Sequence, residues 1–200
     1  MGVLVKPDKI ANRALLISPE GAITARYDKI HMFDVDLPNG EKYRESRNFE
    51  PGGKAVVADL PWGRLGITIC YDLRFPGLYR ALAKGGASFI AIPAAFTVPT
   101  GQAHWHVLMR ARAIEAQCFV LAAAQAGTHE NCRGTFGHSL VVAPWGEVLA
   151  EGDGETASVI MADIDTARVA EARRRVPSLE HDRPFELPAS APKPTFQAAS

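Results

Sequence analysis

The sequence predicts an α/β protein built around a mixed β-sheet. β-Hairpins, which give antiparallel pairing, alternate along the chain with strand–helix–strand units, which give parallel pairing. Of the 200 residues, 47% are hydrophobic, and the sequence contains no short-period repeat. This is enough apolar material for one substantial core. We therefore expect one domain over residues 1–183 and a loose tail over residues 184–200, where Pro, Ala and Ser dominate.

The N-terminal half is expected to form two hairpins separated by a long loop. Residues 14–17 and 22–30 flank Ser-Pro-Glu-Gly, a sequence typical of turns. Residues 34–53 are rich in Asp, Pro, Gly and charge. Loops of this length in a compact domain are usually functional or disordered. The second hairpin is expected over residues 55–60 and 65–70, turning at Pro-Trp-Gly.

The C-terminal half alternates apolar strands with helices. Strands are expected at residues 88–94, 119–126, 139–143, 147–150 and 157–164. Helices are expected at residues 77–84, which Gly85-Gly86 ends, at residues 103–118, and at residues 166–176 with Thr166 as the cap. The expected buried stripe of the middle helix is Val107, Ala111, Ile114 and Cys118, widened by Trp105, Leu108 and Met109.

Composition excludes several classes of function. Twenty-two basic and 22 acidic residues give zero net charge, which disfavours binding to nucleic acid or to an anionic membrane surface. No apolar run approaches the length of a membrane span. Three cysteines are an odd number, which favours a reducing, cytoplasmic setting over a disulfide framework. No Cys/His set has zinc-finger spacing, so we expect no metal and no cofactor.

The most informative stretch of the chain is the junction at Cys70. The β-branched run that ends at Cys70 predicts a strand, and Pro76 prevents the strand from continuing. A cysteine at such a junction can present its sulfur to a substrate above the sheet. An isolated cysteine is more often an ordinary buried thiol, so its neighbours decide between the two interpretations.

Two charged residues are candidate partners of this thiol. Lys29 ends a strand pattern and is placed to project from the same sheet edge as Cys70. Glu45 lies in the long loop. Without further information, a solvated lysine and a solvated glutamate are the ordinary interpretations of both residues.

The order of the motifs resembles the nitrilase superfamily of carbon–nitrogen hydrolases, in its Nit branch. The motifs are Tyr-Asp-Lys-Ile-His at 27–31, Tyr-Arg-Glu-Ser at 43–46, residues 66–76 around Cys70, residues 93–101, His-Trp at 104–105, residues 110–115, Ala-Ala-Ala-Gln at 122–125, Gly-His-Ser at 137–139 and Pro-Trp-Gly at 144–146. The resemblance extends from Lys6 to about Pro184. Ala124-Gln125, Arg133 and Gly137-His138-Ser139 are most similar to the deaminated glutathione amidases.

The resemblance implies a fold and a set of roles. The implied fold is an α-β-β-α sandwich with mixed sheets, of which residues 1–183 would be the C-terminal part. Cys70 corresponds to the nucleophile, Lys29 to the lysine that stabilises the oxyanion, and the backbone N–H of Tyr71 to its second donor. Glu45 corresponds to a structural glutamate that orients the lysine or the base. Arg74, Phe96 and Thr100 correspond to positions that line the substrate pocket.

Other residues keep ordinary interpretations. Without the resemblance, a surface ion pair with Asp72 is an equally good interpretation of Arg74. His104 and His138 are interpreted as packed or turn-satisfying histidines rather than acid–base groups. Cys118 is expected in the core and Cys132 in a loop.

The sequence departs from the family in two places. The family's general base is a glutamate in a Pro-Glu motif after an early strand, and no residue here matches it. Pro19-Glu20 lies in a hairpin turn, so Glu20 is not assigned as catalytic. We therefore expect a complete enzyme of which this sequence is a truncated representation, without the N-terminal strands. The alternative is a chain that exists as it stands. In the second departure, His106 follows His-Trp where close relatives usually have Glu.

The implied activity is cysteine-dependent hydrolysis of a linear amide bond in a small molecule. The expected substrate is deaminated glutathione, split to 2-oxoglutarate and cysteinylglycine in metabolite repair. One alternative is ω-amidase activity on 2-oxo acid monoamides. Another is a catalytically incompetent fragment or pseudoenzyme that lacks the general base. By resemblance alone, we expect a homodimer.

Overall fold

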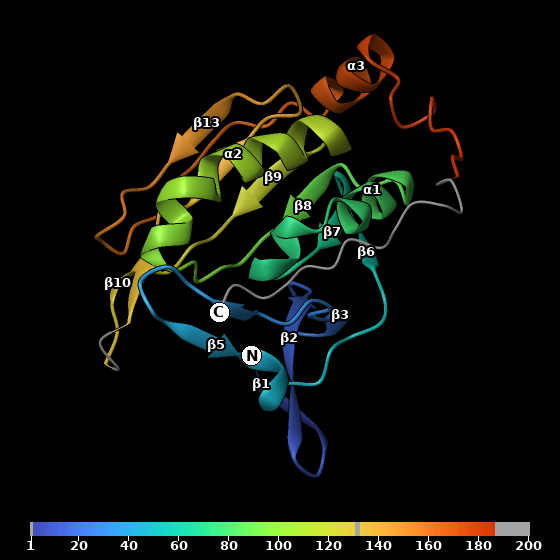
Figure 1. Cartoon of the computed structure of the whole chain (residues 1–200). Coiled ribbons are helices and arrows are strands. Elements are labelled where there is room, and N and C mark those ends of the chain that lie inside the picture. The colour runs from blue at the N-terminus through green and yellow to red at the C-terminus, as the bar shows by residue number, and fades with distance from the viewer. Residues whose placement is uncertain (1, 131–132, 187–200) are drawn as a thin grey trace.

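The computed structural model describes residues 2–130 and 133–186, and its centre is a six-stranded mixed sheet (Figure 1). The strand order is β13 (Val148–Glu151), β12 (Leu140–Val142), β9 (Phe119–Ala122), β8 (Phe89–Ala91), β7 (Gly63–Ile67) and β6 (Val56–Leu60). β7, β8 and β9 pair in parallel, whereas β6, β12 and β13 join by antiparallel pairing. The predicted mixed sheet is confirmed.

Helices cover both faces of this sheet because successive strand residues point to opposite sides. The helices of the described part of the chain are α1 (Pro76–Lys84), α2 (Val98–Ala116) and α3 (Ala167–Arg175). Ile90 and Val120 pack with α1 and α2 in the main core, and their neighbours Phe89 and Phe119 pack on the other side with Val169 of α3. Within the described residues, no helix is long and apolar enough to cross a membrane.

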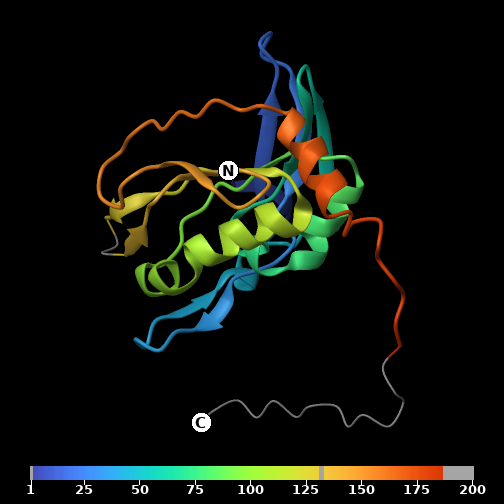
Figure 2. The ribbon, with the colours of Figure 1, turned by 90° about the horizontal axis from the view of Figure 1, so that it is seen from above.

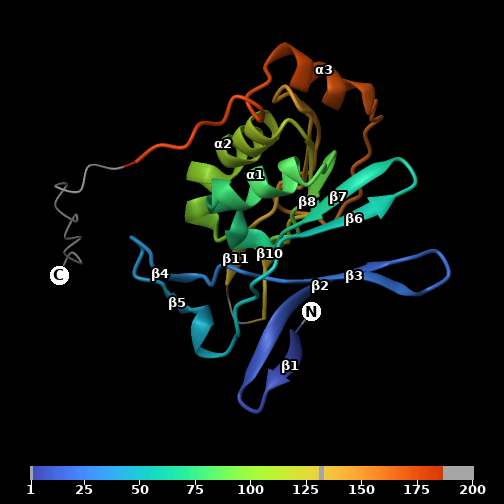
Figure 3. The same cartoon turned by 90° about the vertical axis from the view of Figure 1, so that its right-hand side faces the viewer.

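Three smaller antiparallel sheets of the described residues lie outside the central sheet. They are β1 (Gly2–Lys6), β2 (Lys9–Ile17) and β3 (Ile23–Asp28), then β4 (Asp34–Asp36) with β5 (Lys42–Arg44), and β10 (Ala126–Thr128) with β11 (Gly134–Phe136). Buried Tyr27 of β3 packs against Ile67 and Ile69, so the β2–β3 hairpin forms a second layer against β6 and β7 (Figure 3). The predicted hairpins of the N-terminal half are thereby confirmed.

The structure differs from the predicted elements in three places. The loop expected over residues 34–53 contains the β4–β5 hairpin and the 3-10 helix Glu45–Arg47. The strand expected over residues 157–164 pairs with nothing among the described residues; it arches outside the sheet toward α3 (orange in Figure 2), with Val159 and Met161 exposed. Helix α2 begins at Val98, where Pro99 suits the first turn, five residues earlier than expected.

The apolar stripe predicted for α2 is wrong at Val107 and Ile114 and confirmed at Trp105 and Met109. Val107 and Ile114 are 68% and 48% exposed, whereas the buried face carries Trp105, Met109 and Ala113. Helix α2 has apolar residues on most of its circumference, so the sequence alone does not indicate which face is buried. Packing against the sheet decides this. Cys118 is buried as expected, but it follows the helix rather than lying on it.

The end of the chain holds one further correction. Thr166 precedes α3 but makes no side-chain cap; instead Asp165 accepts the N–H of Ala167 at 2.9 Å. Of the expected tail, residues 184–186 are exposed and without regular structure, and residues 187–200 lie outside the described residues. The domain boundary at 183 stays a prediction.

Helix α2 approaches β11 closely at Gly101, which gives the first testable prediction. A Cβ at Gly101 would lie 2.1 Å from the ring of Phe136. Gly101→Ala therefore forces overpacking, and we expect a loss of about 1–3 kcal/mol in the free energy of unfolding, measured with denaturant. The matched control is Gly77→Ala in the first turn of α1, where a Cβ meets nothing within 4 Å. Equal stability of the two variants would contradict this packing.

Candidate active site

Cys70 lies on a tight turn above the parallel strands. β7 ends at Ile67, and after two extended residues the chain turns into the 3-10 helix Cys70–Arg74. The Cys70 N–H donates to the carbonyl of Pro93 at 2.9 Å, and Cys70 has a left-handed backbone with φ of 49°. Such a conformation is uncommon for a residue other than glycine and costs of order 1 kcal/mol or more. The surrounding structure therefore has to impose it.

The buried carboxylate of Asp72 holds this turn in place. Asp72 is fully buried and accepts the backbone N–H of Ile69 at 2.9 Å, which closes the turn onto the residue before Cys70. It also accepts the Tyr27 hydroxyl at 2.6 Å and the ring and backbone N–H groups of His31 at 2.7 and 3.1 Å. Burial, with the adjacent Asp72 charge, raises the pKa of Tyr27, so the tyrosine stays a donor. One carboxylate thus ties the cysteine turn to β3 and to the loop that follows it.

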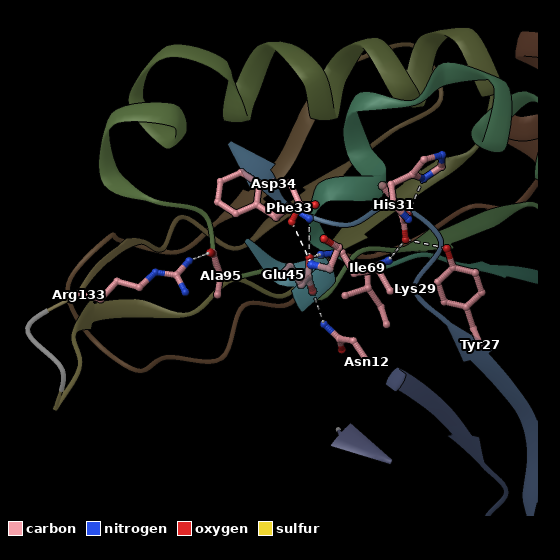
Figure 4. Close-up of polar contacts among 12 residues, drawn as sticks. Asn12, Tyr27, Lys29, His31, Phe33, Asp34, Glu45, Ile69, Ala95 and Arg133 are labelled. Carbon is pink, nitrogen blue, oxygen red and sulfur yellow. Dashed lines mark hydrogen bonds and ion pairs between the residues drawn. The ribbon is translucent and has the colours of Figure 1, made fainter. Parts of the chain in front are cut away.

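Lys29 and Glu45 form a buried ion pair beside this turn (Figure 4). Lys29 directly follows β3 and is only 2% exposed, and its ammonium group donates to Glu45 Oε2. Glu45 also accepts the backbone N–H of Phe33 at 2.7 Å and contacts the amide of Asn12 at 3.4 Å. Because the carboxylate is held from several sides, it fixes the direction of the lysine. The solvated interpretations of Lys29 and Glu45 are wrong.

All of the predicted site residues line one cavity of about 490 Å³. They are Lys29, Glu45, Cys70, Tyr71, Arg74, Phe96 and Thr100. The cavity lies at the carboxyl ends of the parallel strands, where ligands bind in α/β sheets, and its volume suits a small organic molecule. The positions are as predicted; the catalytic and binding roles stay predictions.

Arg74 turns into the cavity rather than pairing with Asp72. Its guanidinium lies 5.5 Å from the ring of Phe96 and 5.9 Å from that of Tyr71, and it donates to His104 Nδ1 at 3.3 Å. Desolvation by burial lowers the pKa of Arg74. The surface ion pair with Asp72 is wrong as an interpretation, because that carboxylate is buried and already fully engaged.

Arg133 is a second guanidinium of the cavity, and sequence reasoning did not place it there. Its guanidinium donates to the carbonyl of Ala95 at 2.8 Å (Figure 4) and lies 5.1 Å from the ring of Tyr43. Asn12, Tyr43 and Gln125 also line the cavity and were not predicted as site residues. These residues come from separate elements with no common spacing, and only the family resemblance singled out Gln125 and Arg133.

Burial sets the protonation state of the nucleophile candidate. Desolvation raises the pKa of the half-buried Cys70 thiol, and Glu45 acts in the same direction. Lys29 and Arg133 act in the opposite direction but do not outweigh the burial. The thiol is therefore predominantly protonated near neutral pH, and attack on a substrate requires a base to remove its proton.

Among the described residues, Glu45 is the only carboxylate that lines the cavity. Glu20 lies in the exposed turn between β2 and β3 and does not line the cavity, in agreement with its omission from the predicted site. His104 is exposed rather than packed, whereas His138 occupies a turn with φ of 57°. Cys70 and Cys118 are both free thiols, and Cys132 lies outside the described residues.

Comparison with known proteins places these features in a family. The sequence profile described as carbon-nitrogen hydrolase matches residues 1–174. A protein of Yersinia enterocolitica named deaminated glutathione amidase is 49% identical over 178 residues, which is 88% of this chain and 62% of that protein. The chain spans 54% to 64% of the length of the curated relatives it matches.

Solved structures agree with the sequence comparison. The NitFhit protein of C. elegans has a TM-score of 0.82 at 42% identity, covering 88% of this chain and 43% of that one. Nit3 of Saccharomyces cerevisiae, described as a member of branch 10 of the nitrilase superfamily, has a TM-score of 0.76 at 34% identity, covering 85% of this chain and 59% of that one. These matches agree with the fold and with the site described above, which holds a thiol beside a paired lysine and carboxylate. The chain belongs to the carbon-nitrogen hydrolase family of the nitrilase superfamily.

Proposed function

We propose that this chain hydrolyses a small-molecule amide through a Cys70 thioester, with deaminated glutathione as the substrate. The single observation that carries the proposal is the convergence of Cys70, the Lys29–Glu45 pair and two guanidinium groups on one cavity. The name deaminated glutathione amidase, which several relatives 43–49% identical to this chain carry, supports the choice of substrate.

The two guanidinium groups match the charge of this substrate. Deaminated glutathione has a 2-oxo acid carboxylate at one end and a glycine carboxylate at the other, with the scissile amide between them. Arg74 and Arg133 line the same cavity as Cys70, and guanidinium binds carboxylate through two parallel hydrogen bonds. A substrate with two carboxylates uses both cations, whereas a 2-oxo acid monoamide uses one.

The proposed reaction forms and then hydrolyses a thioester. The Cys70 sulfur attacks the amide carbonyl carbon, and the oxygen becomes an oxyanion that the Lys29 ammonium and the Tyr71 N–H stabilise. The proton of the Cys70 thiol passes to the amide nitrogen, the carbon–nitrogen bond breaks, and cysteinylglycine leaves as the free amine. Water attacks the thioester, releasing 2-oxoglutarate and restoring the thiol. Glu45 keeps Lys29 directed at the oxyanion rather than acting on the sulfur itself.

One observation favours the alternative of a chain that does not turn over. The raised pKa of Cys70 requires a base, and the one carboxylate that lines the cavity within the described residues is already bound by Lys29. A chain of this kind would bind the amide without cleaving it.

Turnover separates these possibilities. We expect the purified chain to release 2-oxoglutarate from deaminated glutathione, with a higher kcat/KM than for 2-oxoglutaramate. Cys70→Ala should reduce the rate by at least about a thousandfold, because no other group forms the acyl intermediate. The matched control is Cys118→Ala, which removes the other free thiol of the described chain. Preference for 2-oxoglutaramate would favour ω-amidase activity, and no turnover by the folded chain would favour the incompetent alternative.

Substrate binding should depend on the charge of Arg74. Arg74→Gln removes a charge-assisted bidentate contact worth about 1.5–3 kcal/mol, so kcat/KM should fall roughly 10- to 150-fold. The loss should be smaller for an ester or amide of the substrate that lacks the contacted carboxylate. Arg80→Gln on the outer side of α1, which removes an ion pair with Asp182, is the matched control. Equal effects of the two variants would exclude a role of Arg74 in recognition.

The raised pKa of Cys70 predicts slow alkylation near neutral pH. Since the thiolate is the reactive form, the rate of labelling by iodoacetamide should rise with pH, with a midpoint above that of the same cysteine in the denatured chain. Mass spectrometry of the Cys70 peptide measures this rate without interference from Cys118, whose pKa is raised to about 11. A midpoint below the denatured value would mean that Lys29 and Arg133 outweigh burial.

A further inference from the structure

A cluster of two imidazoles and a carboxylate lies outside the cavity and has no part in the proposed reaction. His106 is on α2, His138 follows β11, and Glu151 ends β13. His106 Nε2 and His138 Nδ1 each lie 2.8 Å from the same oxygen, Glu151 Oε1. The ligand atoms of the three residues all lie within 4.8 Å of one another. None of the three lines the candidate active-site cavity.

We propose that His106, His138 and Glu151 form a binding site for Zn²⁺, with water in the fourth coordination position. Two imidazole nitrogens and one carboxylate are a donor set that zinc takes in proteins, and three protein ligands with an open fourth position are common. This proposal departs from the expectation of no metal, which rested on zinc-finger spacing. The three ligands are far apart in sequence, so no spacing rule finds them.

The geometry needs only small changes to accept the ion. Zinc–nitrogen and zinc–oxygen bonds of about 2.0–2.2 Å place tetrahedral ligands roughly 3.3 Å apart. The present contacts of 2.8 Å are hydrogen bonds in which both rings donate to one carboxylate oxygen. Coordination requires each ring to carry its proton on the other nitrogen, which is a tautomer shift without loss of a proton. The side chains of His106, His138 and Glu151 are 38%, 30% and 38% exposed, so an ion and a water molecule can reach them.

One of the ligands, His138, is held in place before any ion arrives. The ring of His138 stacks on Phe136 with centroids 4.4 Å apart, and its backbone is left-handed with φ of 57°. Gly154 allows the His138 ring to approach, because a Cβ there would lie 2.8 Å from His138 Nε2. The backbone N–H of His138 donates to the carbonyl of Asp153 at 3.2 Å, which further fixes the position of this ligand. Preorganised ligands reduce the cost of ordering on binding.

Zinc at this site would join three elements behind the cavity wall. It would replace the two hydrogen bonds by which Glu151 already links α2 to the ends of β11 and β13. Trp105 precedes His106, donates to the carbonyl of His138 at 2.7 Å, and packs on Phe96 at 4.9 Å. Phe96 lines the cavity, so the proposed ion would stiffen the helix that carries one side of the active site.

The first experiment measures zinc binding directly. The tag-free chain, stripped with a chelator, is titrated with ZnCl₂ against a chromophoric competitor. We expect one zinc ion per chain, and an affinity at least about 100-fold lower in His106→Gln and in His138→Gln, since even changes around the ligands cost 10- to 100-fold. His181→Gln, which changes an exposed histidine after α3, and Cys70→Ala should bind zinc as the unmodified chain does. Absence of binding, or equal loss in His181→Gln, would overturn the proposal.

A second experiment identifies the ligands even if one variant folds poorly. Co²⁺ in place of zinc should give the visible absorption of a tetrahedral site without a thiolate charge-transfer band, and Glu151→Gln, which keeps an acceptor for both rings, should abolish it. In thermal unfolding, zinc at a hundredfold excess over its Kd should raise Tm by roughly 5–10 °C in the unmodified chain and not in Glu151→Gln. A thiolate band that disappears in Cys70→Ala would place the metal at the active-site cysteine and overturn the proposal.

Discussion

The fully buried carboxylate of Asp72 is the interaction on which the candidate active site depends. A buried charge is costly unless each lone pair has a donor, and here Tyr27, His31 and Ile69 supply them. Those donors come from β3, from the loop after it and from the residue before Cys70. The carboxylate therefore does more than stabilise one turn: it sets the position of the cysteine relative to the strand that delivers Lys29.

A second carboxylate that accepts hydrogen bonds from several groups lies beside Lys29. Glu45 binds Lys29 and accepts the N–H of Phe33, so the loop that contains Glu45 is anchored by the residue it orients. Lys29 is 2% exposed, and removing either member of a buried ion pair leaves the other charge buried and uncompensated, which is strongly destabilising. Two carboxylate-centred networks thus position the site: the Glu45 network lines the cavity, and the Asp72 network holds the Cys70 turn from outside it.

Local patterns predicted the hairpins, the helix α1 and the mixed sheet, because turn residues and apolar periodicity act within a few neighbours. They failed where tertiary packing decides. The buried face of α2 is set by contact with the sheet, so Val107 was placed inside and is exposed. Local patterns drew attention to Cys70 and Lys29 at strand ends, but the family resemblance rather than periodicity implied roles for them and for Glu45. Arg133 was noticed in that resemblance, but its place in the cavity depends on β10 and β11 pairing far from the cysteine.

The left-handed backbone at Cys70 has a consequence for how this protein can change. A φ of 49° is strained for residues other than glycine, so replacing Cys70 by a larger residue would remove the thiol without relieving the strain of the backbone. Glycine adopts this φ without steric cost, so the residue that the backbone favours here carries no thiol. The proposed chemistry and the backbone geometry therefore favour different residues at this one position.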